Sequence, residues 1–454
     1  MYKTKNPHAL GKENIKKLLL SYSIPAVISM TLVSLYNVID GIFIGHGVGP
    51  LAISGLAVTF PLMNLITAVS TLVGIGGATL TSIQLGKQDS EGASRILWNV
   101  LALCIFNGIM FSAISLIFIE PILTFFGASE ETLPYAKEFM TVFVLGLPVT
   151  YVFLGLNNIM RTTGYPAKAM QSSFLTVGCN LITAPLFIFK FEWGMHGAAF
   201  ATVISQFAGF VWVLSHFLDK KSFIRFDRTY LKVSWHFIKE ICAIGMSPFL
   251  INVCASAIVI VINNSLEIHG GDLAVGAYGI VNRTLTLFVM VVIGLGLGMQ
   301  PIIGYNFGAK KLERVRKTLY YCILTAVITT TFGFVMIEVF PRSISALFTS
   351  DTELINLASE GLRITGLLFP LVGCQIIIGY FFQSIAMPKI SIFLSLTRQL
   401  LYLLPFLLLL PRHMGITGVW ASMPAADLLA FITAILTLIH HAKRSGDYSK
   451  AVLS

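Results

Sequence analysis

A single aspartate stands near the end of the first long apolar run of the chain. Asp40 lies 23 residues after Lys17, which is about 35 Å along an α-helix at 1.5 Å per residue, and Ile42 and Phe43 continue the apolar run beyond it. A carboxylate in that position costs roughly 3 kcal/mol unless it is partnered, hydrated or protonated. Asp40 is therefore a candidate for reversible proton binding. The competing interpretation is an aspartate that simply reaches the outer membrane interface.

Other polar side chains could complete a site around Asp40. Tyr36 and Asn37 precede it by four and three residues and therefore lie on the same face of a helix. Later apolar runs contain further uncharged polar residues, namely Asn157, Asn158, Asn180, Thr202 and Gln206. Each of these could instead form a hydrogen bond that holds two membrane helices together, so both interpretations stay open.

The second half of the chain also has charges inside its apolar runs. Arg398 and Asp427 fall inside the last two runs, and such charges usually face the interior of a helix bundle and pair with one another. Asp427 is the second functional candidate, and a structural ion pair with Arg398 is the alternative. Glu267 lies at the end of an apolar run, which favours an interfacial role.

The chain lacks the residue patterns of common enzyme and cofactor sites. No HExxH or GxSxG motif occurs, and the sequences at Gly86 and Gly308 lack the spacing of a nucleotide-binding P-loop. The six cysteines are single and the nine histidines are dispersed, which predicts no metal site. We therefore expect neither an enzyme nor a cofactor. Energy for transport must come from an ion gradient or from the gradient of the substrate itself.

Membrane helices are the elements that must position these residues. Of the 454 residues, 56% are hydrophobic and 11% are charged, whereas a soluble domain has roughly 25% charged residues. Runs of about 20 apolar residues, long enough to cross a bilayer, recur from one end of the chain to the other. Twelve spans of an all-α membrane protein are predicted, at residues 18–43, 56–83, 96–119, 139–159, 168–189, 197–217, 240–265, 276–303, 318–340, 360–383, 390–410 and 416–438.

Lysine and arginine are distributed unevenly over the connections. Of the 31 such residues, 24 lie at the two ends of the chain or after even-numbered spans, and four lie in the other connections. Positive connections stay on the cytoplasmic side, which predicts a multi-pass protein of the cytoplasmic membrane with both termini in the cytoplasm. The net charge of +10 follows this pattern and does not indicate nucleic-acid binding. The basic start leads into a full-length apolar run without a small-residue cleavage site, which predicts a membrane helix and no cleaved signal peptide.

The chain repeats itself with a period near 222 residues. The matching residues include Gly86 and Gly308, Pro148 and Pro370, and Pro166 and Pro388. Six spans per half give both halves the same orientation, and parallel repeats of this kind are a feature of transporters. The predicted organisation is an N-lobe at 1–217, a cytoplasmic inter-lobe loop at 218–239 and a C-lobe at 240–454. The second half lacks a matching acid, since Asp40 aligns with Asn263.

Four segments resemble the multidrug and toxic compound extrusion (MATE) transporters, in the bacterial drug-efflux branch. They are Leu35–Asp40, Arg161–Pro166, Gly197–Thr202 and Gln300–Lys310. The similarity occurs in order and covers essentially the whole chain. It implies a V-shaped pair of six-helix lobes and cation-coupled export of chemically diverse amphiphiles.

The resemblance also implies where the coupling site lies. Asp40, Asn180 and Thr202 occupy positions where the family builds its cation or proton site in the N-lobe, and Asn157 is a further candidate for it. The family commonly has a second carboxylate four residues after the asparagine, where this chain has Ala184. A single carboxylate favours the proton as coupling ion, because a tight sodium site needs several oxygen ligands. Sodium coupling stays open as the alternative.

The expected substrates are small amphipathic, often cationic compounds. Fifteen methionines and 34 phenylalanines supply adaptable contacts that suit promiscuous recognition. The candidate residues of a substrate cleft are Tyr36, Asn37, Met63, Phe153, Gln206, Tyr278, Asn282, Met290 and Tyr380. We expect a monomer in contact with membrane lipid. The rival functions are a flippase for lipid-linked saccharides of the same superfamily, which only Arg283, Arg363 and Arg398 within spans would support, and a membrane receptor or scaffold without transport.

Overall fold

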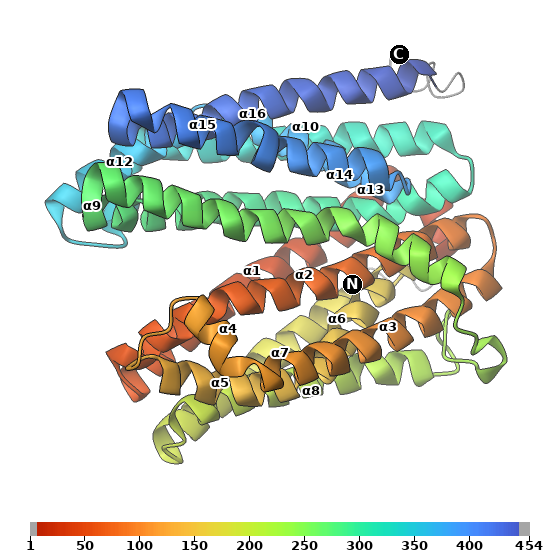
Figure 1. Cartoon of the computed structure of the whole chain (residues 1–454). Coiled ribbons are helices and arrows are strands. Elements are labelled where there is room, and N and C mark those ends of the chain that lie inside the picture. The colour runs from red at the N-terminus through yellow and green to blue at the C-terminus, as the bar shows by residue number, and fades with distance from the viewer. Residues whose placement is uncertain (1–6, 445–454) are drawn as a thin grey trace. The chain divides into compact units, whose positions relative to one another are not determined.

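The structure of the protein, a computed structural model, describes residues 7–444, and every element in that range is helical (Figure 1). The α-helices are α1 (Ile15–Gly47), α2 (Pro50–Gly86), α3 (Ser90–Ile117), α4 (Ile119–Phe125), α5 (Leu133–Leu145), α6 (Leu147–Thr162), α7 (Pro166–Pro185), α8 (Gly194–Leu218), α9 (Trp235–Gly308), α10 (Leu312–Val339), α11 (Pro341–Ala346), α12 (Thr352–Gly366), α13 (Phe369–Ser384), α14 (Pro388–Leu396), α15 (Leu404–Leu409) and α16 (Pro411–Arg444). Short helices η1 (Pro7–Gly11) and η3 (Arg228–Tyr230) are of the 3-10 type, and η2 (Leu186–Lys190) and η4 (Thr397–Leu403) are π-helical. The predicted all-α fold is confirmed.

Most of these helices are long and apolar enough to cross a membrane. Ten segments meet that condition, and two bent helix pairs raise the number to as many as twelve. The long helix α9 supplies two of the ten, because it breaks at Gly271, where φ is 63°. Glycine adopts this left-handed backbone without a steric penalty. The number agrees with the twelve spans predicted from the apolar runs.

The fourth and tenth spans are bent where the sequence predicted continuous runs at 139–159 and 360–383. The helix axes turn by 58° between α5 and α6 and by 54° between α12 and α13. Pro148 and Pro370 stand at the second position of the helices that follow the two bends. A proline has no N–H to donate and clashes with the preceding turn, so it begins a new helix more readily than it continues an old one. The two bends are therefore copies of one feature, 222 residues apart.

The chain folds into two compact units whose boundaries differ from the predicted lobes. Unit 1 contains residues 1–12 and 28–249, and unit 2 contains residues 13–27 and 250–454. The predicted lobes instead ended at 217 and began at 240, with the whole first span in the N-lobe. The first part of α1 thus belongs to unit 2, and the first part of α9 belongs to unit 1.

Glycines in the second span of each half explain this exchange. In unit 2, a Cβ placed on Gly298 would lie 2.6 Å from the Cα of Ser23, and in unit 1 a Cβ on Gly76 would lie 3.2 Å from the backbone nitrogen of Gly245. Such short distances mean that the backbones touch directly. Ser23 and Gly245 are 222 residues apart, as are Gly76 and Gly298, so the two helix contacts repeat each other.

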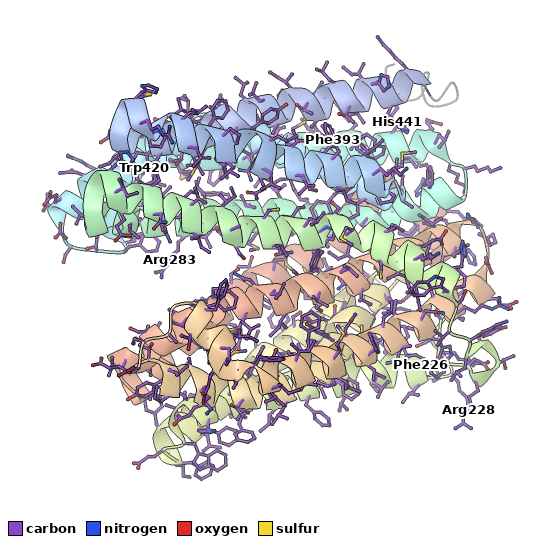
Figure 2. All side chains as sticks on the ribbon, viewed as in Figure 1. Phe226, Arg228, Arg283, Phe393, Trp420 and His441 are labelled. Atoms are coloured by element: carbon purple, nitrogen blue, oxygen red, sulfur yellow. The ribbon has the colours of Figure 1, made fainter. Side chains whose placement is uncertain are left out.

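Each unit has its own buried interior. In unit 1, α6 packs against α2, α3, α7 and α8 and buries Tyr151 and Phe153. In unit 2, Trp420 of α16 (Figure 2) is fully buried in a cluster with residues of α9, α10 and α12. Large apolar side chains such as Ile117 and Phe125 remain exposed, as expected for surfaces that face lipid.

Candidate functional site

The second part of α1 is held against α8 and η2. Tyr36 Oη and Thr202 Oγ1 are hydrogen-bonded at 3.1 Å, which joins α1 to α8. About two turns further along α1, the ring of Phe43 meets that of Phe189 in η2 edge to face, with centroids 6.3 Å apart. These contacts lie on either side of Asp40 in the sequence and fix the part of α1 that carries it.

Asp40 is buried in unit 1 without a full set of hydrogen-bond partners. The residue is 7% exposed, and its Oδ1 has no hydrogen-bond partner among the described residues. It stands one helical turn after Tyr36 on the same face of α1. A buried oxygen that lacks a donor is costly, and it is satisfied by a proton, an ion or a ligand.

Asn180 on α7 presents a complementary orphan. Only 1% of the residue is exposed, and its Nδ2, a hydrogen-bond donor, has no partner in the described part of the chain. Ala184, one turn further, is fully buried and adds no polar atom. The two predicted coupling residues Asp40 and Asn180 therefore each keep a polar atom for something other than the fold.

Asn157 and Gln206, by contrast, are used in bonds between helices. Asn157 Nδ2 donates to Ser172 Oγ, which joins α6 to α7. Gln206 Oε1 accepts from Thr150 Oγ1, which joins α6 to α8. The structural interpretation, which the sequence left open, fits both residues. Sequence reasoning missed their partners Ser172 and Thr150, because only the packing of the helices brings them close.

Two of the predicted cleft residues are packing residues within their own units. Phe153 lies against Gly209 of α8, where an added Cβ would come within 2.7 Å of its ring. The ring of Tyr380 lies equally close to Gly296 of α9. Both side chains fill space that a glycine on the neighbouring helix leaves open.

The other predicted cleft residues are found in unlike surroundings. Tyr278 is buried beside Trp420, with ring centroids 6.3 Å apart, while Asn282, one turn later, is exposed and Met290 is half-buried. The i, i+4 spacing therefore does not give Tyr278 and Asn282 a common environment. The side chain of Asn37 lies outside the described part of the structure.

In unit 2, Asp427 of α16 forms an ion pair with Arg398 of η4. Arg398 Nε donates to Asp427 Oδ1 at 2.6 Å. The Asp427 side chain is 6% exposed and that of Arg398 is 33% exposed. Further along the same two elements, Tyr402 Oη and Thr433 Oγ1 are bonded at 2.9 Å. Asp427 therefore has a partner of opposite charge, whereas Asp40 Oδ1 has no partner among the described residues.

A protein-bound metal ion has no set of ligands in the described residues. No group of three or more histidine, cysteine, aspartate or glutamate residues in residues 7–444 is arranged to hold one. The described cysteines are unpaired and all at least partly buried.

Twelve apolar spans in two repeated halves, with buried charges in both, define a multi-pass membrane transporter. The MatE family model matches residues 25–186 and 246–408, one match in each half, and the chain therefore belongs to the MATE family. The resemblance based on Leu35–Asp40 and the other segments is confirmed. The protein is a transporter and not an enzyme.

Known relatives match almost the full length of the chain. The multidrug export protein MepA of Staphylococcus haemolyticus (strain JCSC1435) is 26% identical over 94% of each chain. The MATE multidrug transporter DinF-BH, solved in complex with a small molecule, is 34% identical, covers 95% of this chain and 96% of that one, and has a TM-score of 0.88. A structure of MATE in complex with MaL6 has a TM-score of 0.92 at 23% identity, covers 99% of this chain and 100% of that one, and so has the same fold.

Proposed function

We propose that this transporter is a multidrug exporter that exchanges protons for amphipathic, often cationic compounds across the cytoplasmic membrane. The observation that carries the proposal is the buried Asp40, whose Oδ1 has no hydrogen-bond partner in residues 7–444. The proposed coupling site contains Asp40, Asn180 and the bonded pair of Tyr36 and Thr202. Asn157 supports it by holding α6 to α7.

The substrate class rests on the relatives. MepA is a multidrug export protein, and DinF-BH is a multidrug transporter solved with a bound small molecule. An anionic Asp40 attracts a cation, and the aromatic ring of Tyr36 one turn away adds a face that favours lipophilic cations. When Asp40 takes up a proton it loses that charge, so a cationic compound bound beside it is released.

The proton is favoured over sodium by the number of carboxylates. Sodium sites in transporters combine several oxygen ligands. Asp40 and Asp427 are the buried carboxylates among the described residues, and Asp427 is bonded to Arg398. Asp40 thus acts with neutral neighbours, and Ala184 supplies no second carboxylate. One carboxyl group is sufficient to bind and release a proton.

The orientation of the chain follows its charges. With 24 of 31 lysines and arginines at the ends of the chain and after even-numbered spans, the positive-inside rule favours cytoplasmic termini. We take the protein to act as a monomer, since each unit buries its own interior and the proposed site lies within unit 1.

The proposal is tested by efflux of ethidium, a fluorescent lipophilic cation, from membrane vesicles under separately imposed proton and sodium gradients. We expect a proton gradient to drive efflux and Asp40→Asn to abolish it. The matched control is Glu267→Gln, which neutralises an exposed acid at the end of a span and should leave efflux unchanged. Efflux that survives in Asp40→Asn contradicts the assignment of Asp40. Efflux that only a sodium gradient drives contradicts proton coupling and leaves export in place.

A further inference from the structure

Unit 2 has a small cavity at the start of α10. Its volume is about 380 Å³, and the residues that line it are Glu313, Arg316, Lys317, Tyr320 and Tyr321. Lys16 of α1 extends over the ring of Tyr321, with its Nζ 5.2 Å from the ring centroid. Segment 13–27 of α1 and all of α10 belong to unit 2, so one unit forms the whole cavity.

The cavity combines positive charge with aromatic rings. Three cations, Lys16, Arg316 and Lys317, stand against one carboxylate, Glu313, which is bonded to Lys317 at 2.5 Å. The group therefore keeps a positive balance and favours a ligand with negative charge. Tyrosine hydroxyls donate hydrogen bonds to such a ligand, and tyrosine is enriched where membrane proteins meet the headgroup region.

Two exposed apolar stripes lead away from the cavity along the helices. On α10, Tyr320 is followed at four-residue intervals by Leu324, Ile328 and Phe332, all exposed. On α1, Leu20 and Ile24 follow Lys16 at the same interval and are also exposed. Four-residue spacing keeps the side chains on one face of a helix. From Tyr320 to Phe332 the stripe extends about 18 Å, slightly more than half of a hydrocarbon layer of about 30 Å.

The equivalent face in unit 1 is covered by protein. By the 222-residue repeat, Tyr320 and Tyr321 correspond to Trp98 and Asn99 of α3. Trp98 Nε1 donates to the carbonyl of Asp227 at 2.9 Å, and its ring packs on Phe226 with centroids 4.8 Å apart. Figure 2 shows Phe226 on the segment that follows α8.

The second residue of this pair is covered in the same way. Asn99 Nδ2 donates to the carbonyl of Lys232 at 3.1 Å, and Asn99 Oδ1 accepts from the backbone nitrogen of Ser234 at 2.8 Å. In unit 2 the equivalent residues line a cavity, and Tyr320 is 62% exposed. The repeat thus has a face that is occupied in unit 1 and, within residues 7–444, open in unit 2.

We propose that this cavity binds the headgroup of an anionic phospholipid, with its acyl chains along the stripes of α10 and α1. The phosphate lies between Arg316 and Lys16, and the tyrosine hydroxyls bond to its oxygens. Juxtamembrane cations attract anionic lipids, and the positive-inside pattern puts this end of α10 at the cytoplasmic leaflet. A free phosphate would satisfy the cations but would leave the adjoining apolar stripes without a function, which is why the occupant is a lipid.

The test compares lipid binding by the purified, full-length protein in native mass spectrometry. Phosphatidylglycerol and phosphatidylcholine with identical acyl chains are the two probes. We expect phosphatidylglycerol to be retained preferentially by the unaltered protein. Since each cation near the membrane surface contributes about a five-fold change in affinity, the variant Lys16→Gln/Arg316→Gln should lose roughly 25-fold. Glycerol 3-phosphate should not displace the lipid, because it lacks acyl chains.

The matched control removes the same charge elsewhere. Arg228 and Lys232 are exposed in the segment between α8 and α9, and Arg228→Gln/Lys232→Gln should leave the preference within about two-fold of the original, since neither cation lies at the cavity. Equal retention of both lipids by the unaltered protein, or equal losses in the two double variants, overturns the proposal. Should Lys16→Gln/Arg316→Gln not fold, Tyr321→Leu, which removes the hydroxyl and the contact with Lys16, gives the second measurement. An unchanged preference in Tyr321→Leu also overturns it.

Discussion

Arg398 Nε lies 2.6 Å from Asp427 Oδ1 and joins the π-helical segment η4 to α16 inside unit 2. Pro405 stands shortly after η4 in α15, and a proline removes a backbone hydrogen bond to the preceding turn. A π-helical stretch just before it accommodates that loss. Both features locate Arg398 where its guanidinium meets the carboxylate of a neighbouring helix.

Removing one partner of this pair should destabilise the protein. In Asp427→Asn, Arg398 loses its counter-charge, and a buried charge without its partner costs about 3–5 kcal/mol. We expect about 3 kcal/mol, the low end of the range, because a third of the Arg398 side chain is exposed. Thermal unfolding in detergent measures this loss. The double variant Arg398→Met/Asp427→Leu should recover most of it, and a double variant as unstable as Asp427→Asn would show that the charge is not the cause.

Asn157 and Asn180 should respond to alanine in opposite ways. Asn157→Ala removes the bond to Ser172 and should cost about 1 kcal/mol of stability. Asn180→Ala removes a buried Nδ2 without a partner in the described residues, so the free energy of unfolding should stay the same or rise. Transport should show the reverse order, with proton-driven ethidium efflux reduced more by Asn180→Ala. If Asn180→Ala lowers stability and leaves efflux intact, Asn180 is a packing residue.

The sequence predicted the helices well because hydropathy is a local property. The apolar runs indicated the spans, and the charges of the connections indicated the alternation between them. The repeat was visible in pairs such as Pro148 and Pro370. It did not predict the bends that follow from those prolines, since a bent and a straight span have the same average hydropathy.

The site could be predicted in part, for the same physical reason. Asp40 was recognised because a carboxylate in an apolar run is conspicuous by itself. The roles of Asn157 and Gln206 depend on Ser172 and Thr150, which packing alone brings near. Likewise, nothing in the hydropathy of the segment 13–27 records that it packs in unit 2, because the contact of Ser23 with Gly298 is a tertiary one.

The segment between α8 and α9 should keep its position on α3 at neutral pH and loosen in acid. Hydrogen bonds from the backbone N–H and then from the hydroxyl of Thr229 hold the pKa of Asp227 below its ordinary value of 3.8. A carboxyl with a lowered pKa contributes stability that is fully present above its ordinary pKa and is lost as the pH falls through the folded value. Its backbone carbonyl accepts the bond from Trp98.

Trp98 fluorescence provides the measurement for this segment. Its emission should stay constant from about pH 7 to about pH 4 and shift to longer wavelength below, as water reaches the indole. In Asp227→Asn, which keeps the shape but does not titrate, the shift should disappear. A shift of equal size in both proteins, compared with a Trp98→Phe variant as the blank, would assign the transition to another acid.

The glycine contact that ties segment 13–27 into unit 2 should be intolerant of any side chain. A Cβ on Gly298 would lie 2.6 Å from the Cα and the backbone nitrogen of Ser23. Backbone atoms of two packed helices cannot yield as a side chain can, so Gly298→Ala should cost about 1–3 kcal/mol through overpacking. Gly279 on the same helix α9 has no atom within 4 Å of its Cβ position. Gly279→Ala should therefore stabilise the protein by up to about 1 kcal/mol, because alanine favours a helix more than glycine does. Thermal unfolding of the two variants side by side decides the matter. Equal midpoints would show that segment 13–27 is not packed closely against α9, and that the exchange of first helices between the units is looser than the backbone contact indicates.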